Sequence, residues 1–381
     1  MQVVQSRFDR HTDTPWDFSP MTALEPDLVL VFGSYAFLNE TDFDTALRKS
    51  LPSKTLLAGC STAGEISNQG VSDEHMVVSA VRFDKVTLAS ATTQVANLED
   101  SENAGARLGK QLNREGLKAV CLYAPGVDLN GSALIDGLAG VIGKEIPISG
   151  GLAGDGGAFK QTLTLNRDGL DARSVVVIGL YGDALKFGYG SFGGWSPFGP
   201  ARKVTRCEGN ILHELDGEPA LNIYKDYLGD YAKDLPASGL LFPFEMLEAN
   251  QDTSGLIRTI LGIDEESGSL TLAGDINPDG YLRLMHANVD GLVDGAEEAA
   301  RLTMRSNEET PPSLAILVSC VGRKLVMGDQ VDEEVEAVQD ILGENAMVTG
   351  FYSYGEINPF IGLQECSLYN QTMTICTLSE V

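Results

Sequence analysis

The sequence predicts an α/β fold in which mixed β-sheets are covered by helices and the arrangement is internally duplicated. Apolar strand-like runs alternate with segments of helical periodicity, and this alternation recurs along the chain. The composition, with 43% hydrophobic and 21% charged residues and 42 glycines, is typical of a globular α/β protein. At 381 residues the chain is long enough for two domains with sizeable cores.

The first block, from Asp27, has the order strand, helix, strand. DLVLVFGS is an apolar strand, and Phe43, Ala46 and Leu47 then mark one face of a helix. The following strand ends in GCSTAGEI, which occupies residues 59–66. This order predicts a βαβ-like unit that closes on a glycine-rich turn.

A second block near the C-terminus repeats this order. LAILVSCVGR predicts a strand, residues 331–342 have an apolar helix face, and the next strand runs into GFYSYGEI at residues 350–357. Gly59 then corresponds to Gly350, and the pairs Gly64-Glu65 and Gly355-Glu356 coincide. A third, fainter copy consists of AVCLYAPG, a helix over residues 134–142, and IPISGGLAGDGG, which contains Gly154-Asp155.

Two segments between these blocks, 75–94 and 268–287, have the pattern of β-hairpins, and each precedes a helical pattern. The residues from 235 to 254 have little periodicity and predict irregular structure. We therefore expect an N-terminal extension, two domains of the same kind and a C-terminal strand, with the ranges 1–26, 27–205, 206–365 and 366–381.

The charge excludes some functions. Acidic residues outnumber basic ones 54 to 27, and the net charge of −27 disfavours binding to nucleic acid or to an anionic membrane. The excess of acidic residues either keeps the protein soluble in a salt-rich cell or forms a docking face for a partner.

The N-terminus lacks the apolar core of a signal peptide, so we expect a cytoplasmic protein. The six scattered cysteines predict reduced thiols.

The motif GCSTAGEI has two interpretations. A nucleophile at Cys60 or Ser61 would make the protein a hydrolase or transferase, but the motif departs from the GxSxG pattern of a nucleophile elbow. The C-terminal copy also has Phe351 and Tyr352 at the two corresponding positions. The shared glycines therefore favour a binding turn without catalysis, and the nucleophile stays the alternative.

Glycines at strand ends permit a sharp turn or let a ligand or a helix approach the main chain, and ligands of such sheets gather there. Glu65 and Glu356 would either hold a cationic group of the ligand or cap loop amides. The aromatic and glycine-rich stretch from Phe187 to Phe198 is either an apolar slot for a planar ligand or an irregular core strand. The expected ligand-binding residues are Gly59, Cys60, Ser61, Gly64, Glu65, Trp195, Tyr352, Tyr354, Gly355 and Glu356.

Several motifs in one order resemble the FIST family, whose members carry an N-terminal and a C-terminal FIST domain. The motifs are GCSTAGEI, GGLAGD, ELDGEPALNIY, GDINPDGYLRLM, SCVGRK and GFYSYGEI, and they extend from about Asp27 to about Phe360. The resemblance implies a cytoplasmic, non-catalytic sensor of a small ligand, for which amino acids have been proposed. It also implies that a separate partner, such as a histidine kinase or a diguanylate cyclase, supplies the output.

A stand-alone subgroup of the family, NosP, has a similar length, binds haem and reports nitric oxide. The four histidines, His11, His75, His213 and His286, have no partner at i+3 or i+4, which disfavours a metal site built from neighbouring ligands. A single histidine can still hold a haem iron. The alternative reading is therefore a haem sensor with His286 or His213 as the axial ligand, and the leading reading has no metal.

Overall fold

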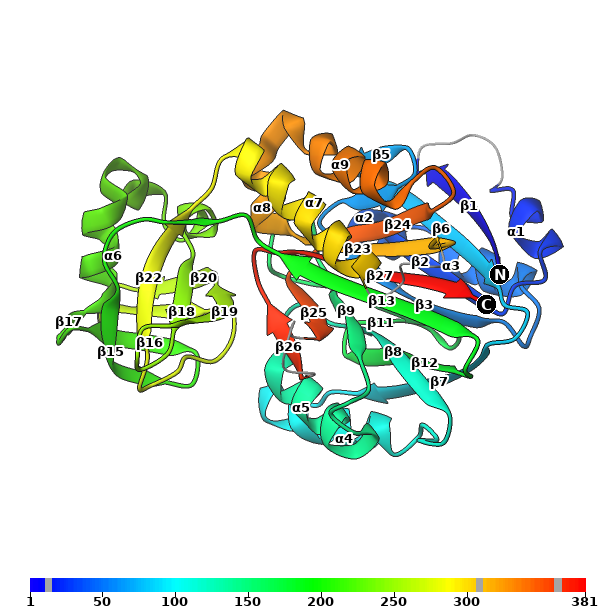
Figure 1. Cartoon of the computed structure of the whole chain (residues 1–381), viewed down its shortest axis with the longest axis horizontal. Helices are drawn as coiled ribbons and strands as arrows, with labels where there is room; N and C mark the ends of the chain where they lie inside the picture. The colour runs from blue at the N-terminus through cyan, green and yellow to red at the C-terminus, as the bar shows by residue number, and fades with distance from the viewer. Residues whose placement is uncertain (11–15, 306–310, 360–364) are drawn as a thin grey trace.

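The computed structural model describes residues 1–10, 16–305, 311–359 and 365–381. It confirms an α/β fold of mixed sheets covered by helices. The chain forms a body and a smaller lobe (Figure 1). The body consists of three structural repeats around three six-stranded sheets, and the lobe is inserted into the third repeat.

The first repeat contains the predicted N-terminal βαβ unit. Its central strands are parallel, because the helical connection between them returns the chain to the same end of the sheet. Its elements are β1 (Gln2–Asp9), α1 (Ser19–Ala23), β2 (Leu28–Ser34), α2 (Tyr35–Glu40), α3 (Phe43–Ser50), β3 (Leu56–Thr62), β4 (Glu65–Ser67), β5 (Gly70–Ser72) and β6 (His75–Arg82).

The second repeat is the copy that is faint in the sequence, yet it has the same order of strands and the same parallel central pair. Its elements are β7 (Thr87–Gln94), η1 (Leu98–Asp100), α4 (Ser101–Gly109), β8 (Leu117–Ala124), α5 (Gly131–Ile142), β9 (Ile148–Leu152), β10 (Thr164–Asn166), β11 (Gly169–Asp171) and β12 (Ser174–Tyr181).

The third repeat again has a parallel central pair, β23 with β24. Its elements are β13 (Leu185–Phe192), α7 (Val289–Arg305), β23 (Leu314–Cys320), α8 (Val321–Met327), η4 (Gly328–Gln330), α9 (Asp332–Leu342), β24 (Met347–Ser353), β25 (Gly355–Pro359), β26 (Cys366–Tyr369) and β27 (Met373–Glu380).

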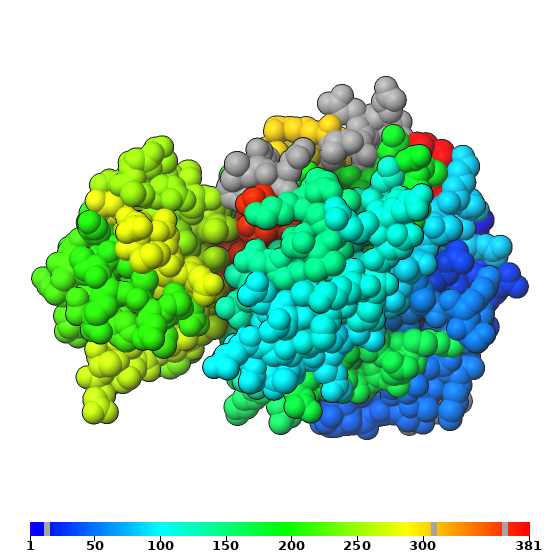
Figure 2. All heavy atoms as spheres, turned by 90° about the horizontal axis from the view of Figure 1, so that it is seen from below, coloured from blue at the N-terminus to red at the C-terminus, as the bar shows by residue number. Residues whose placement is uncertain are grey.

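The lobe, residues 196–286, lies between β13 and α7 and has its own apolar core. Figure 2 shows it as a separate mass beside the body. Its elements are β14 (Ser196–Pro197), β15 (Arg202–Glu208), β16 (Ile211–Leu215), β17 (Glu218–Pro219), α6 (Ala220–Leu228), η2 (Gly229–Asp234), η3 (Ala237–Leu241), β18 (Phe244–Leu247), β19 (Thr253–Arg258), β20 (Ile260–Asp264), β21 (Ser269–Leu272) and β22 (Tyr281–His286).

Each repeat gives its short hairpin to the sheet of another repeat. The hairpin β4–β5 of the first repeat pairs with β24, the hairpin β10–β11 of the second pairs with β3, and the hairpin β25–β26 of the third pairs with β9. The first strand of each repeat lies at the edge of that repeat's own sheet, where β1 pairs with β6, β7 with β12 and β13 with β27. The three repeats are therefore interlocked in a ring.

Two local predictions are wrong, and a third holds only in part. Segment 75–94 is no hairpin, because β6 pairs with β1 and β2 while β7 joins another sheet. Segment 268–287 is no hairpin either, because β21 and β22 pair with different strands of the lobe. Alternation of apolar residues indicates which face of a strand is buried, but it does not identify the neighbouring strand. Within 235–254, residues 244–247 form the regular strand β18.

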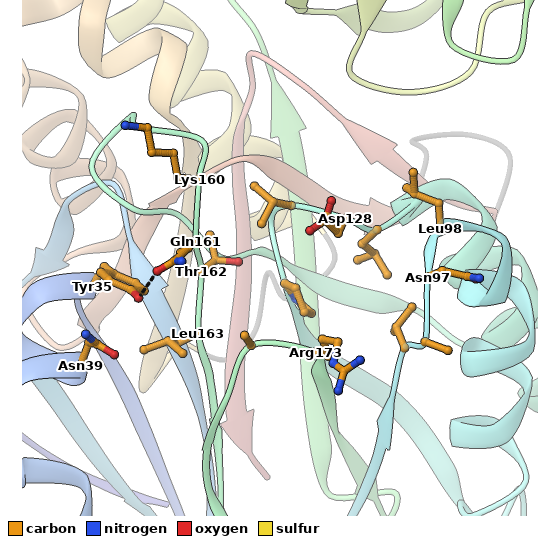
Figure 3. A pocket seen from close by; sticks show the side chains of 16 residues that line it. Tyr35, Asn39, Asn97, Leu98, Asp128, Lys160, Gln161, Thr162, Leu163 and Arg173 are labelled. Carbon is orange, nitrogen blue, oxygen red and sulfur yellow. Dashed lines mark hydrogen bonds between the residues drawn. The ribbon is translucent and has the colours of Figure 1, made fainter.

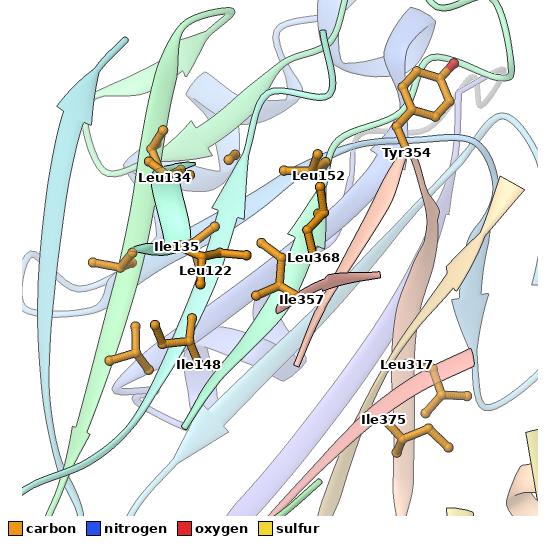
Figure 4. Packing of buried hydrophobic residues seen from close by; sticks show 14 of the residues in the cluster. Leu122, Leu134, Ile135, Ile148, Leu152, Leu317, Tyr354, Ile357, Leu368 and Ile375 are labelled. Carbon is orange, nitrogen blue, oxygen red and sulfur yellow. The ribbon is translucent and has the colours of Figure 1, made fainter. Parts of the chain in front are cut away.

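The interior of the body is a cluster of apolar side chains from the inner faces of all three sheets, including the ring pair Phe32 and Phe351 at 4.8 Å between centroids. A larger cluster lies between the outer sheet faces and the helices and includes Leu134, Ile135 and Leu152 (Figure 4).

The chain termini lie side by side, and the amino group of Met1 lies 3.1 Å from the carboxylate of Glu380.

Candidate functional site

The carboxyl-terminal ends of β3, β9 and β24 meet at one place in the body. The N–H of Ala63 donates to the carbonyl of Tyr352, and the N–H of Tyr352 donates to the carbonyl of Gly64, both at 2.8 Å. The N–H of Gly154 donates to the carbonyl of Ser61 at 2.8 Å. The structure thus brings the two predicted turns and their equivalent in the second repeat together, and we call residues 61–64, 152–156 and 352–355 the strand-end junction.

One glycine of each repeat permits the close approach of two parallel strands. A Cβ atom on these glycines would lie 1.9, 1.9 and 1.8 Å from the carbonyl oxygen of the paired residue, so only glycine fits. The pairs are Gly59 with Val31, Gly150 with Leu122, and Gly350 with Leu317. The first glycine of each predicted motif therefore serves strand pairing.

The reactive groups of GCSTAGEI are buried and already bonded. The hydroxyl of Ser61 donates to the carbonyl of Gly154 at 2.7 Å and accepts from the N–H of Leu163 at 2.9 Å. Cys60 is buried in the apolar interior, and burial raises the pKa of its thiol well above the ordinary value. Because the thiolate is the nucleophilic form, this environment disfavours a nucleophile at Cys60.

Glu65 and Glu356 close their own turns. The hydroxyl of Thr62 donates to the carboxyl of Glu65 at 2.6 Å, and the hydroxyl of Ser353 donates to that of Glu356 at 2.6 Å. Burial is the main cause that raises the pKa of both carboxyl groups to about 8. These hydrogen bonds occupy one oxygen of each carboxyl group, and a ligand-binding role of the two acids stays a prediction.

Tyr354 and Asp155 shape the loop between β9 and β10. The carboxylate of Asp155 accepts hydrogen bonds from the N–H groups of Phe159, Lys160 and Gln161 at 2.8 to 2.9 Å. The hydroxyl of Tyr354 accepts from three N–H groups of this loop and donates to Asp155, while its ring stacks on Phe159 at 4.0 Å. A residue of the third repeat therefore holds a loop of the second.

This loop forms one wall of an open cleft of about 690 Å³ between the first and second repeats, which we call the main cleft. In Figure 3, Tyr35, Lys160 and Gln161 lie on one side and Asn97 and Asp128 on the other. The hydroxyl of Tyr35 donates to the amide oxygen of Gln161 at 2.6 Å. The cleft lies where β8 ends, which is the usual place for a ligand in such a sheet.

Three charged side chains line the main cleft without a bonding partner of their own. Within the ranges that the structure describes, the side chains of Lys160, Arg173 and Asp128 make neither a hydrogen bond nor an ion pair. Asp128 and Phe159 also have the left-handed backbone, with φ of 58° and 53°. Such strain in residues other than glycine concentrates at functional sites.

The predicted site residues are distributed over different surroundings. Trp195 and Tyr354 line cavities of about 250 and 340 Å³. Trp195 donates from its indole N–H to the carbonyl of Gln371 at 2.8 Å. The remaining eight are buried in or beside the strand-end junction, and their role in ligand binding stays a prediction; they are Gly59, Cys60, Ser61, Gly64, Glu65, Tyr352, Gly355 and Glu356.

The aromatic and glycine-rich stretch from Phe187 to Phe198 starts inside β13. This strand pairs with β27 along its whole length, so its pairing is regular and not that of an irregular strand.

His286 is exposed at the end of β22 with its ring 5.9 Å from that of Phe198, and His213 is half-buried on β16. His11 lies outside the described residues. Haem binding through His286 or His213 stays a prediction.

The lining residues of the main cleft were missed by sequence reasoning. Most of them lie in loops, where no periodicity singles them out. Neither Lys160 nor Arg173 belongs to a recognisable sequence motif. One signal was available: AVCLYAPG predicts a strand that ends at Pro125 and Gly126, and the rule that ligands gather at strand ends points to the residues that follow.

Family models for the FIST N domain and the FIST C domain match residues 27–218 and 220–359. The chain therefore belongs to the FIST family, whose domains are sensor domains associated with signalling. The two matches divide at residue 219, compared with the predicted division at 205, and the domain ranges stay a prediction.

Among the described residues, no helix has both the length and the apolar composition needed to span a membrane.

Two curated relatives carry no assigned function. An uncharacterised protein of Methanocaldococcus jannaschii is 24% identical over 354 residues, which cover 81% of this chain and 65% of that protein. An uncharacterised protein of Mycobacterium tuberculosis is 27% identical over 175 residues, which cover 44% of this chain and 45% of that protein. The chain thus spans less than two thirds of the length of these relatives.

Two solved structures are similar over nearly their whole length. One is cyanuric acid hydrolase from A. caulinodans, with 9% identity, a TM-score of 0.38 and 99% of each chain covered. The other, also a cyanuric acid hydrolase, has 10% identity and a TM-score of 0.37, with 100% of this chain and 99% of that chain covered. Similarity at this level carries no argument about function.

Proposed function

We propose that this protein is a non-catalytic, cytoplasmic sensor of a small amino acid-like ligand, and that it controls a separate partner such as a histidine kinase or a diguanylate cyclase. The observation that carries the proposal is the main cleft, with its charged side chains that have no partner, in a chain of a sensor family. Its volume of about 690 Å³ falls in the range of small-molecule sites.

The charges of the main cleft suit a zwitterion. Arg173 and Lys160 would attract a carboxylate, and Asp128 would attract an ammonium group. In a chain with a net charge of −27, two lysine or arginine side chains without acidic partners are available to an anionic group of a ligand. All three residues are exposed to water, and a bound zwitterion would give each charge a partner of opposite sign.

The residues that the sequence singled out would act by positioning this cleft. Ser61 accepts a hydrogen bond from Leu163, which lines the main cleft, and Tyr354 holds the loop that carries Lys160 and Gln161. Movement of this loop on ligand binding would therefore reach the strand-end junction, and through it all three repeats. We propose this route for the signal to the partner.

Isothermal titration calorimetry of the full chain with individual amino acids tests the proposal. Arg173→Gln should weaken binding at least about tenfold, because a charge-assisted hydrogen bond is lost. Tyr354→Phe keeps the stacked ring but removes the hydroxyl, and it should weaken binding several-fold through the loop.

Lys54→Gln is the matched control, because Lys54 is exposed and does not line the main cleft. Its affinity should equal that of the unchanged chain. The proposal fails if no amino acid binds, or if Arg173→Gln and Lys54→Gln bind equally well.

A further inference from the structure

We propose a second ligand site, in which a small, neutral and flat aromatic ligand with an N–H donor binds in a cavity where the body joins the lobe. This junction cavity has a volume of about 250 Å³. The body contributes residues 191–195, where β13 leads into the lobe (Figure 1), and the lobe contributes residues of β18, β19 and β22. The inference does not depend on the ligand of the main cleft, with which this cavity shares no lining residue.

The walls of the junction cavity are mostly apolar. Trp195 packs with Met285 and the half-buried Ile257 in one apolar cluster, and all three line the cavity. Phe192 lines it as well, yet this residue remains 47% exposed. A large apolar side chain that is left in contact with water at a concave surface favours an apolar ligand. The ring of a bound ligand would cover Phe192.

The aromatic side chains of the wall favour a flat ligand. Gly193 and Gly194 contribute only main chain to the cavity, so a flat ring can lie close to the backbone there. Aromatic rings prefer offset-stacked or edge-to-face contacts with a second ring. In the part of the chain that the structure describes, neither Phe192 nor Trp195 has another aromatic ring in such a contact. An aromatic ligand would supply it.

One accessible acceptor in the wall lacks a donor. Glu245 lines the cavity, and its Oε2 accepts both hydrogen bonds from Arg283, at 3.1 Å from Nε and 2.7 Å from Nη2. Its Oε1 accepts no hydrogen bond from any residue that the structure describes. This oxygen is not closed off from water, and 12% of the side chain remains exposed. Since carboxylate oxygens in such surroundings are normally paired, Oε1 is available to an N–H group of the ligand.

The remaining polar groups select a neutral ligand. Arg283 balances the charge of Glu245, and the described lining includes no lysine, arginine or histidine that would attract an anion. The indole N–H of Trp195 and the hydroxyls of Ser191 and Thr372 already have hydrogen-bond partners within the protein. An N–H group that donates to a carboxylate makes a charge-assisted hydrogen bond, which is stronger than a bond between neutral groups. Because the walls come from both the body and the lobe, a ligand bound there would connect the two.

The probe is 5-fluoroindole, whose binding to the full chain is followed by the broadening of its fluorine NMR signal. Indole and benzofuran then compete with the probe, and benzofuran has the same fused rings with an oxygen in place of the N–H. Indole should displace the probe at a concentration at least about fivefold lower than benzofuran, because only indole donates to Glu245. Absence of probe binding, or equal competition by indole and benzofuran, would overturn the inference.

Variants identify the site. Phe192→Ala and Phe198→Ala are a matched pair, since the two residues are 47% and 43% exposed and only Phe192 lines the cavity. Phe192→Ala should weaken probe binding at least about fivefold and Phe198→Ala should not, while melting temperatures show whether both variants are folded. Glu245→Met removes the acceptor and should make indole and benzofuran equal competitors. If the two phenylalanine variants bind the probe alike, or if Glu245→Met keeps the preference for indole, the ligand does not bind in this cavity.

Discussion

At the scale of the residue, the most unusual groups are the buried carboxyl groups of the turns. Glu356 is buried, accepts a hydrogen bond from the hydroxyl of Ser353 at 2.6 Å, and accepts two more from the N–H and hydroxyl of Thr372 at 3.2 and 3.1 Å. Burial raises the pKa of its carboxyl from the ordinary value of 4.5 to about 8. This shift favours the protonated form of Glu356 in the folded protein at neutral pH.

This proton makes stability depend on pH. Between about pH 4.5 and 8 the unfolded chain releases the proton of Glu356 and the folded chain keeps it, so the free energy of unfolding falls as pH rises. Glu356 should contribute on the order of 2 to 4 kcal/mol to this decline in the free energy of unfolding between pH 5 and 8, and Glu356→Gln should remove that contribution. Urea denaturation at a series of pH values measures it.

Glu344→Gln is the control, since Glu344 is exposed at the start of the turn before β24. It should keep the decline of the unchanged chain. An equal decline in the chain with Glu356→Gln would show that this carboxyl is ionised in the folded state.

At the scale of the element, close contact of parallel strands depends on one glycine per repeat. Gly350→Ala would place a Cβ atom 1.8 Å from the carbonyl oxygen of Leu317, so β23 and β24 would have to separate. We expect a loss of at least about 3 kcal/mol in the free energy of unfolding, which urea denaturation would show.

Gly140→Ala provides the contrast. Gly140 is exposed in α5 and a Cβ atom there would meet nothing within 4 Å, so this change should stabilise by about 0.5 to 1 kcal/mol through helix propensity. A loss from Gly350→Ala no larger than 1 kcal/mol would mean that the strands adjust easily.

Elements were predictable where their signal is local. The apolar run at 314–320 and the helix face that includes Val335 and Val338 appear as β23 and α9. The partners of the strands were not predictable, because residues 65–67 have the same alternation whether they pair with β3 or, as observed, with β24. The contacts of Tyr354 were not predictable either, because they join different repeats. It was expected at the rim of a ligand site, whereas in the structure its hydroxyl bonds to a loop of the second repeat.

At the scale of the whole molecule, one buried ion pair of the body holds the two segments that connect the body to the lobe. Arg323 and Glu334 are fully buried and bonded at 2.7 Å. The guanidinium also donates to the carbonyls of Gly193 and Leu292, which lie in the two segments that lead into and out of the lobe. Arg323 therefore holds both connections at once.

Arg323→Met should cost about 3 to 5 kcal/mol of stability, because it leaves the carboxylate of Glu334 buried without its cation. Adding Glu334→Met should restore much of this loss. Hydrogen exchange should nevertheless be faster at residues 193–195 and 288–292 in both variants, since neither has the guanidinium. Unchanged exchange there in the double variant would show that contacts other than those of Arg323 hold these two segments.

The exchange of hairpins among the three repeats has a consequence for how the chain acquires its structure. In a solenoid, each unit contacts only its neighbours in sequence and can be added or removed singly. Here the sheet of the first repeat lacks two strands until the second repeat has been synthesised, and the sheet of the second lacks two until the third is complete. The body should consequently fold in one cooperative, late step, and the deletion of a single repeat would leave one sheet without its hairpin and one hairpin without its sheet.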